Sequence, residues 1–114
     1  MRVYPSEHEE QATLIKWARS KGLDLLFAIP NGTYTNISVA KRLKQSGLTP
    51  GIPDLFLAVA RQGAHGLFIE MKAMKGNASP LQKAWQAALE SQGYRAVVCH
   101  GFEAAKAVIE DYLG

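Results

Sequence analysis

Two neighbouring apolar runs decide the fold of this chain: TPGIPDLFLAVA at residues 49–60 and LFIEMKA at residues 67–73. Residues 49–53 are rich in turn-forming residues and form a rigid segment that leads into a strand. Residues 54–60 are typical of a short strand buried on both faces. Residues 62–66 contain two glycines and predict a hairpin loop, which makes residues 67–73 the returning strand. The two runs therefore predict an antiparallel pair of strands.

Two capping boxes mark the starts of helices on either side of this pair. Ser6 is followed three residues later by a glutamate, which predicts a helix over residues 7–21 that closes at a glycine. Ser79 is followed at once by a proline and three residues later by Gln82, which predicts a helix over residues 80–91. In each box the two side chains satisfy backbone N–H groups that the first turn leaves unpaired.

The rest of the chain completes an α/β pattern. Further strands are predicted at residues 23–30 and 94–99, a basic helix at residues 36–46 and an amphipathic helix at residues 102–113. The predicted order is α-β-(α)-β-β-α-β-α, which gives a small mixed β-sheet flanked by helices. We expect a single domain over residues 1–114, because the chain shows no internal repeat and no linker.

The composition excludes several classes of protein. A chain of 114 residues with 47% hydrophobic and 20% charged residues suffices for one domain and is too apolar to be disordered. No apolar run is long enough to cross a bilayer and the N-terminus lacks a secretory signal, so no membrane partner is expected. The single cysteine, Cys99, excludes a disulfide framework and fits a reducing, cytoplasmic compartment. The sequence has no Walker A loop, which predicts no nucleotide cofactor.

The positive charge is concentrated in the middle of the chain. The net charge is only +3, but residues 31–83 hold seven basic side chains and two acidic ones, a balance of 7 − 2 = +5. A basic central segment predicts a polyanionic partner. The two acids inside it are Asp54 and Glu70, and their presence there needs an explanation.

Asp54, Glu70 and Lys72 are the charged residues of the two apolar runs. Charges in buried strands are costly unless they are paired. Glu70 and Lys72 are two residues apart, so their side chains lie on the same face of the sheet. If the hairpin closes near Gly63, Asp54 lies opposite or diagonal to Lys72, and the three groups share one small volume.

Two neighbouring carboxylates repel each other unless a cation lies between them. Oxygen ligands favour a hard divalent ion, Mg²⁺ or Mn²⁺, and the backbone carbonyl of Met71 could add a ligand. Such an ion polarises a phosphodiester, while Lys72 could orient the attacking water or stabilise charge on the phosphoryl oxygens. The alternative is structural, with Asp54 capping a turn and Glu70 pairing with Lys72. The Gly-Ile-Pro-Asp motif on the neighbouring strand favours the site.

An aspartate after Pro53 followed by Glu70-Met71-Lys72 resembles the signature of the PD-(D/E)xK nuclease superfamily. Five blocks more specifically resemble the small stand-alone VRR-NUC proteins of phages and bacteria: SEHEEQ at 6–11, IPNG at 29–32, GIPD at 51–54, GLFIEMK at 66–72 and SPLQ at 79–82. The resemblance implies a restriction-endonuclease-like core and metal-dependent cleavage of DNA phosphodiesters, specific for branched structures or junctions. It also implies a homodimer that works in the cytosol of bacteria or of phage-infected hosts.

The resemblance assigns roles to individual residues. Asp54 and Glu70 match the metal ligands of the family, and Lys72 matches its catalytic lysine. The acid of the family's first helix, a further candidate ligand and catalytic residue, matches Glu7 best. Glu10 is the rival, and the sequence leaves the choice open.

Other residues are assigned from the resemblance or from their charge. Gln82 matches a helix glutamine of the family's active site, in addition to its role in the capping box. The three histidines lack metal-ligand spacing, and His100 at a strand end is predicted to be structural. DNA contacts are expected at one turn amide and four basic side chains: Asn31, Lys41, Arg42, Lys44 and Lys75.

Two other classes of function remain as alternatives. The first is a non-catalytic nucleic-acid-binding module with a vestigial nuclease site, and the second is a protein-interaction subunit with an incidental basic face. The complete set of two acids and a lysine favours the enzyme.

Overall fold

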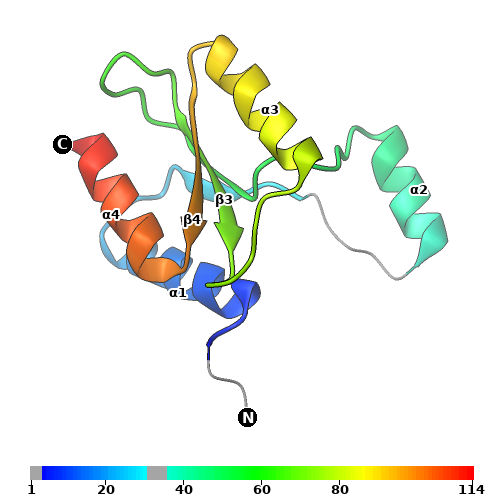
Figure 1. Cartoon of the computed structure of the whole chain (residues 1–114), viewed down its shortest axis with the longest axis horizontal. Helices are drawn as coiled ribbons and strands as arrows, with labels where there is room; N and C mark the ends of the chain where they lie inside the picture. The colour runs from blue at the N-terminus through cyan, green and yellow to red at the C-terminus, as the bar shows by residue number, and fades with distance from the viewer. Residues whose placement is uncertain (1–3, 31–35) are drawn as a thin grey trace.

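A mixed sheet of four strands forms the centre of the computed structural model, which describes residues 4–30 and 36–114 of the chain (Figure 1). The helices and strands follow the predicted order α-β-α-β-β-α-β-α, which confirms the α/β class. Their bounds are α1 Glu7–Ser20, β1 Leu26–Ala28, α2 Ile37–Gln45, β2 Leu55–Leu57, β3 Leu67–Lys72, α3 Pro80–Ser91, β4 Arg95–His100 and α4 Phe102–Leu113.

The strand order in the sheet is β1-β2-β3-β4. β2 pairs antiparallel with both β1 and β3, as expected for a hairpin, whereas β3 and β4 are parallel and are connected through α3. β2 has three residues and is therefore shorter than the predicted run of 54–60. Beyond Leu57 the chain leaves the ladder with β3 and turns back through Gln62 and Gly63, which have positive φ angles of 50° and 78°.

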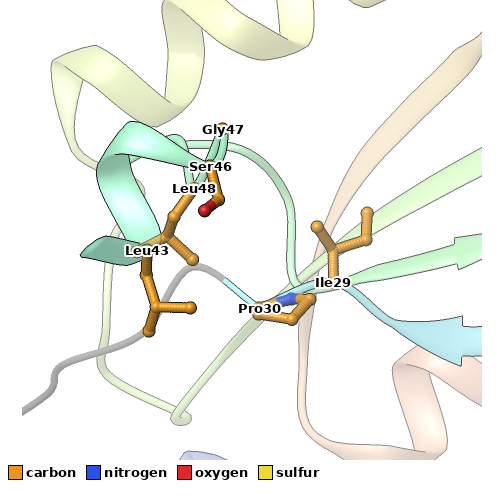
Figure 2. A pocket seen from close by; sticks show the side chains of 6 residues that line it. All are labelled: Ile29, Pro30, Leu43, Ser46, Gly47 and Leu48. Atoms are coloured by element: carbon orange, nitrogen blue, oxygen red, sulfur yellow. The ribbon is translucent and has the colours of Figure 1, made fainter. Parts of the chain in front are cut away.

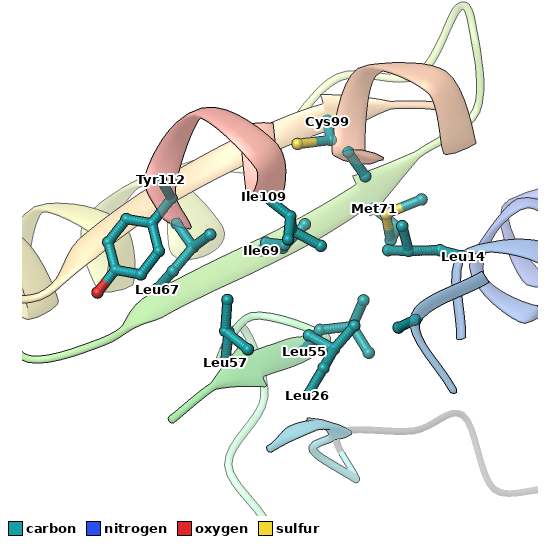
Figure 3. Close-up of a cluster of buried hydrophobic side chains, with 12 residues drawn as sticks. Leu14, Leu26, Leu55, Leu57, Leu67, Ile69, Met71, Cys99, Ile109 and Tyr112 are labelled. Atoms are coloured by element: carbon teal, nitrogen blue, oxygen red, sulfur yellow. The ribbon is translucent and has the colours of Figure 1, made fainter. Parts of the chain in front are cut away.

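The hydrophobic core lies on the face of the sheet that α1 and α4 cover (Figure 3). Alternate residues of β3 point into it, together with side chains from the neighbouring strands and from both helices: Leu14, Leu26, Leu55, Leu57, Leu67, Ile69, Met71, Cys99, Ile109 and Tyr112. Because side chains of a strand alternate between faces, Phe68, Glu70 and Lys72 belong to the opposite face. α3 lies over that face, since it packs against β4 and its Gln82 contacts Glu70.

Both predicted capping boxes are present. The Ser6 hydroxyl accepts from the N–H of Glu9 at the start of α1, and the Ser79 hydroxyl accepts from the N–H of Gln82 at the start of α3. In each case the N3 side chain accepts a hydrogen bond from the backbone N–H of its serine. These local hydrogen bonds fix where the two helices that border the site begin.

α2 stands apart from the rest of the fold (Figure 1). No other helix or strand of the described chain packs against it, none of its residues is buried, and Ile37 is 85% exposed. Asn36 caps the helix by accepting from the N–H of Val39 at 3.1 Å. A cavity of about 270 Å³ separates the end of α2 from the segment after β1, with apolar side chains on both sides (Figure 2), and its lining is Ile29, Pro30, Leu43, Ser46, Gly47 and Leu48.

Of the helices in residues 4–30 and 36–114, the longest has 14 residues, and none combines the length and apolar character that a membrane span requires.

Candidate active site

Asp54 lies immediately before β2, at the point where the β2–β3 ladder ends. Its Oδ2 oxygen accepts a hydrogen bond from the backbone N–H of Met71 at 2.8 Å. Leu55 pairs with Ile69, so the antiparallel register places Asp54 across from Glu70 and diagonal to Lys72. The sequence left open whether Asp54 lies opposite or diagonal to Lys72; the register shows the diagonal arrangement, which brings the three charged residues together.

Glu70 is the buried charged residue of the site, with 2% of its surface exposed. Its Oε2 oxygen accepts from Nε2 of Gln82 at 3.0 Å and forms an ion pair with Nζ of Lys72 at 3.9 Å. Its other oxygen, Oε1, is buried and has no hydrogen-bond partner. A buried carboxylate oxygen without a partner is costly, so this position is suited to a ligand that the carboxylate can bind.

The pKa of Glu70 is raised from its usual 4.5 to about 8, chiefly by burial. The neighbouring Asp54 contributes to this rise, and the charge of Glu7 makes a smaller contribution. Lys72 lowers the pKa, but its single positive charge does not offset the other contributions. Burial and the neighbouring carboxylates therefore outweigh the lysine in setting the pKa of Glu70.

These residues fit a hard divalent cation. Glu70 offers the unpartnered Oε1, and Asp54 lies beside it across the ladder. The N–H and C=O of one strand residue point to the same side, so the carbonyl of Met71 faces Asp54, as its N–H does. Residues 4–30 and 36–114 contain no group of three or more His, Cys, Asp or Glu side chains that could hold a metal ion. Glu7, which was expected as a further ligand, therefore does not form such a group with Asp54 and Glu70. The donors that remain are two carboxylates and a carbonyl, a set that suits a cation that keeps several waters, as Mg²⁺ does.

The structure separates the two glutamates of α1 that the sequence left open. Glu7 acts on the site, because its charge raises the pKa of Glu70. Glu10 instead contacts α4, where its Oε2 oxygen accepts from the backbone N–H of Phe102 at 3.3 Å. α4 begins at Gly101, which has no side chain to cap the helix, so Glu10 supplies the missing cap. Of the two glutamates, Glu7 is therefore the one whose charge acts on Glu70, and Glu10 is the one that caps α4.

Gln82 takes part in both the helix cap and the site. Its Oε1 accepts from the N–H of Ser79 at 2.8 Å, and its Nε2 donates to Glu70. Because the oxygen is used by the cap, the amide nitrogen is the atom left to face the carboxylate. The capping contact was predicted from the sequence, whereas the resemblance implied only that Gln82 belongs to the active site, without naming Glu70 as its partner.

The basic residues expected to contact DNA lie in two places. Lys41, Arg42 and Lys44 are exposed on α2, away from the body of the protein. Lys75 lies in the loop between β3 and α3, with its Nζ 5.9 Å from the centre of the Tyr4 ring. Asn31 lies outside the described residues.

Two further residues were not assigned to the site from the sequence. Gln86 lies one helical turn after Gln82 on α3, and its Nε2 atom is buried without a hydrogen-bond partner. The spacing of four residues from Gln82 is the signal that could have identified it. His100, which was predicted to be structural, is the last residue of β4 and pairs with Lys72 of β3. Its side chain contacts Gly76 in the loop between β3 and α3.

Comparisons with known proteins agree with this fold. The family model of the VRR-NUC domain matches residues 4–103 of the chain. A solved structure described as a VRR_NUC domain protein superimposes with a TM-score of 0.84 and 31% sequence identity, covering 96% of this chain and 88% of that chain. A search of curated proteins gives no match. The chain belongs to the VRR-NUC domain family, whose members are generally nucleases.

Proposed function

We propose that this protein is a metal-dependent DNA endonuclease that hydrolyses phosphodiester bonds with Mg²⁺ or Mn²⁺. The observation that carries the proposal is the pairing of Glu70 with Asp54, in which a buried carboxylate has one oxygen without a partner and a pKa of about 8. A protein keeps such a costly arrangement where a ligand relieves it. A divalent cation is the ligand whose charge and preferred oxygen donors suit these two acids.

Asp54, Glu70 and the carbonyl of Met71 would hold the ion, and Glu7 would add negative charge from α1. When bound, the ion supplies Lewis-acid polarisation of the scissile phosphate and makes water a better nucleophile. Glu70 must release its proton to act as a ligand, and the nearby Lys72 favours its charged form. The N–H of Met71 holds Asp54 in place while Glu70 changes protonation state.

Lys72 and Gln82 would complete the catalytic set. The Nζ atom of Lys72 lies 3.9 Å from Glu70, and its side chain keeps 13% of its surface exposed, so it is reachable by substrate. From there it can orient the attacking water or stabilise charge on the phosphoryl oxygens. Gln82 holds one oxygen of Glu70, which leaves the other oxygen for the ion.

DNA would contact the protein at α2 and at the loop after β3. Lys41, Arg42 and Lys44 give α2 three positive charges, and the segment from residue 36 to residue 53 contains no acid. Lys75 adds a positive charge close to the end of β3. Phosphate contacts of this kind fix the position of the duplex and do not read its sequence.

We further propose that two copies act together as a homodimer on branched or junction DNA. One site in a chain of 114 residues cleaves one strand, so symmetric cleavage of two strands needs two sites. The expected compartment is the reducing cytosol of a bacterium or of a phage-infected host, because Cys99 is a buried free thiol. Sedimentation analysis of the protein alone and with a junction tests the dimer, and a single monomeric species in both samples would exclude it.

A cleavage panel tests the enzymatic proposal. Linear duplex, flap and four-way junction DNAs are incubated with wild type and with Glu70→Ala, in Mg²⁺, Mn²⁺ or EDTA. We expect cleavage by wild type with either metal, none with EDTA, and none by Glu70→Ala, which should still bind DNA. Glu90→Ala, at the exposed end of α3, is the matched control and should cleave as wild type does.

The panel also distinguishes the alternative function. A binding module with a vestigial site would bind DNA with strong salt dependence and cleave none of the substrates with either metal. Cleavage that Glu70→Ala leaves unchanged would exclude the assignment of the site.

A further inference from the structure

His100 is paired with Lys72 across the parallel ladder of β3 and β4. Paired residues of adjacent strands lie on the same face of the sheet, so the histidine belongs to the face that carries Glu70 and Lys72. The Nε2 atom of His100 lies 2.7 Å from the backbone carbonyl oxygen of Gly76. A carbonyl oxygen can only accept, so Nε2 carries the hydrogen and donates it to Gly76.

The loop that receives this hydrogen bond folds back over Lys72. The N–H of Gly76 donates to the carbonyl of Ala73 at 2.9 Å, which closes a tight turn directly after β3. A Cβ atom placed on Gly76 would lie 3.6 Å from Cβ of Lys72 and 3.4 Å from the carbonyl oxygen of Ala73. Gly76 therefore packs against the base of the lysine side chain, and His100 holds it there from the neighbouring strand.

The same loop leads to the other side chain that contacts Glu70. Three residues after Gly76 it reaches Ser79, whose capping box with Gln82 begins α3. Gln82 then donates to the Oε2 oxygen of Glu70, the oxygen with which Lys72 forms its ion pair. The loop thus connects Lys72 and Gln82, the two side chains that contact Oε2 of Glu70. The conformation of the loop therefore determines where both side chains lie relative to that oxygen.

We propose that His100 is a positioning residue of the nuclease site, which acts by holding the turn at residues 73–76 through its hydrogen bond to Gly76. This inference rests on the proposed function, because the geometry that it protects is that of Lys72 and Gln82 around Glu70. The hydrogen bond of His100 is to the loop and not to a ligand carboxylate. Its loss should therefore lower kcat and leave the KM for DNA largely unchanged.

Two amide substitutions give a sharp test. In His100→Gln the side-chain amide reaches as far as Nε2 of histidine and can still donate to Gly76, whereas in His100→Asn it is one methylene too short. We expect His100→Asn to lose about fivefold in kcat, the equivalent of one hydrogen bond, and His100→Gln to stay near wild type. His65→Asn, whose ring packs against Tyr94 near the other end of β4, controls for the loss of a histidine and should keep the wild-type kcat.

Amide hydrogen exchange at Gly76 gives a readout that needs no catalysis. Its N–H closes the turn to Ala73, so exchange should become faster in His100→Asn and remain slow in His100→Gln. Equal exchange or equal kcat in the two variants would overturn the proposed role of His100. Absence of cleavage by wild type would instead overturn the proposed function, and the exchange measurement would still decide whether His100 holds the turn.

Discussion

Gln82 donates its side-chain amide hydrogen to the Oε2 oxygen of Glu70 at 3.0 Å, while its own oxygen caps α3 through Ser79 at 2.8 Å. One side chain therefore fixes both the start of a helix and the orientation of a buried carboxylate. Because the cap determines which end of the amide is the oxygen, the donor is aimed at Glu70 before any ligand binds. Such preorganisation reduces the rearrangement that catalysis requires.

Replacing Gln82 with glutamate separates its two contacts. Glutamate is a normal N3 residue of a capping box, so Gln82→Glu should retain α3. It would however place a second carboxylate against Glu70 in place of a donor, and like charges at that distance repel. We expect cleavage to fall by about tenfold or more with unchanged helix content, measured by kinetics and circular dichroism. The same change at the exposed Gln92 should leave cleavage as it is, and full activity of Gln82→Glu would contradict the proposed contact.

Glu70 should make the stability of the cation-free protein depend on pH. Its pKa is about 8 in the folded protein against a usual 4.5, so the folded state binds the proton more tightly than the unfolded state. The contribution of Glu70 to the free energy of unfolding is therefore greatest below about pH 4.5, and it is lost as the pH rises to about 8. The loss is on the order of a few kcal/mol, and urea unfolding at pH 5, 7 and 9 in EDTA measures it.

Two controls isolate Glu70 in that experiment. Glu70→Gln carries no titrating group and should lose much of the dependence between pH 5 and pH 9. Mg²⁺ at high pH should restore stability to wild type, because an ion that binds only the folded state stabilises it. Equal pH dependence of wild type and Glu70→Gln would show that the carboxylate does not titrate in this range.

The two glutamates of α1 should give opposite phenotypes. Glu7→Ala removes negative charge that is proposed to help hold the ion, so cleavage should fall with little change in Tm. The pKa of Glu70 should also move down, because the charge of Glu7 raises it. Glu10→Ala removes the acceptor for the N–H of Phe102 and should cost about 1 kcal/mol of stability while kcat is retained. Thermal unfolding and cleavage rates measured on both variants decide the question. Loss of cleavage in Glu10→Ala alone would reverse the assignment.

Neutralising α2 should weaken DNA binding without unfolding the protein. The triple variant Lys41→Gln, Arg42→Gln, Lys44→Gln removes three charges, and the slope of log K against log salt should decrease by up to about 3. Its Tm should match wild type, because no described helix or strand packs on α2. Lys16→Gln with Lys21→Gln, exposed on and just after α1, serves as the control and should change the slope less. An unchanged slope in the triple variant would exclude α2 from the DNA interface.

Features that depend on short stretches of sequence were predicted well. The capping boxes at Ser6 and Ser79 each involve residues three apart, so the sequence shows the complete hydrogen-bonding unit. The position of Asp54 beside Glu70 follows from strand alternation and an antiparallel hairpin, which need only an approximate loop length. The predicted helix at residues 36–46 also forms, because Asn36 provides a cap.

Features that depend on long-range packing were not predicted. Glu10 and Phe102 are separated by 92 positions, and nothing near either residue indicates their contact. The unpartnered oxygen of Glu70 depends on how α3 docks on the sheet, which no local pattern determines. The proximity of His100 to Lys72 and Gly76 arises from the parallel register of β3 and β4, which is set by the connection through α3. The sequence does not show this register, so it predicts only a structural role for His100.

The isolation of α2 separates the parts of the chain that determine stability from the part that we propose contacts DNA. Folding places no demand on the identity of the residues of α2, since none of them is buried in the described core. Its length, charge or angle can therefore change while the sheet and the paired acids stay intact. A designer who wished to alter the proposed DNA contact could replace the nine residues of α2, Ile37–Gln45, as a cassette and keep the buried Pro53 and the rest of the body unchanged.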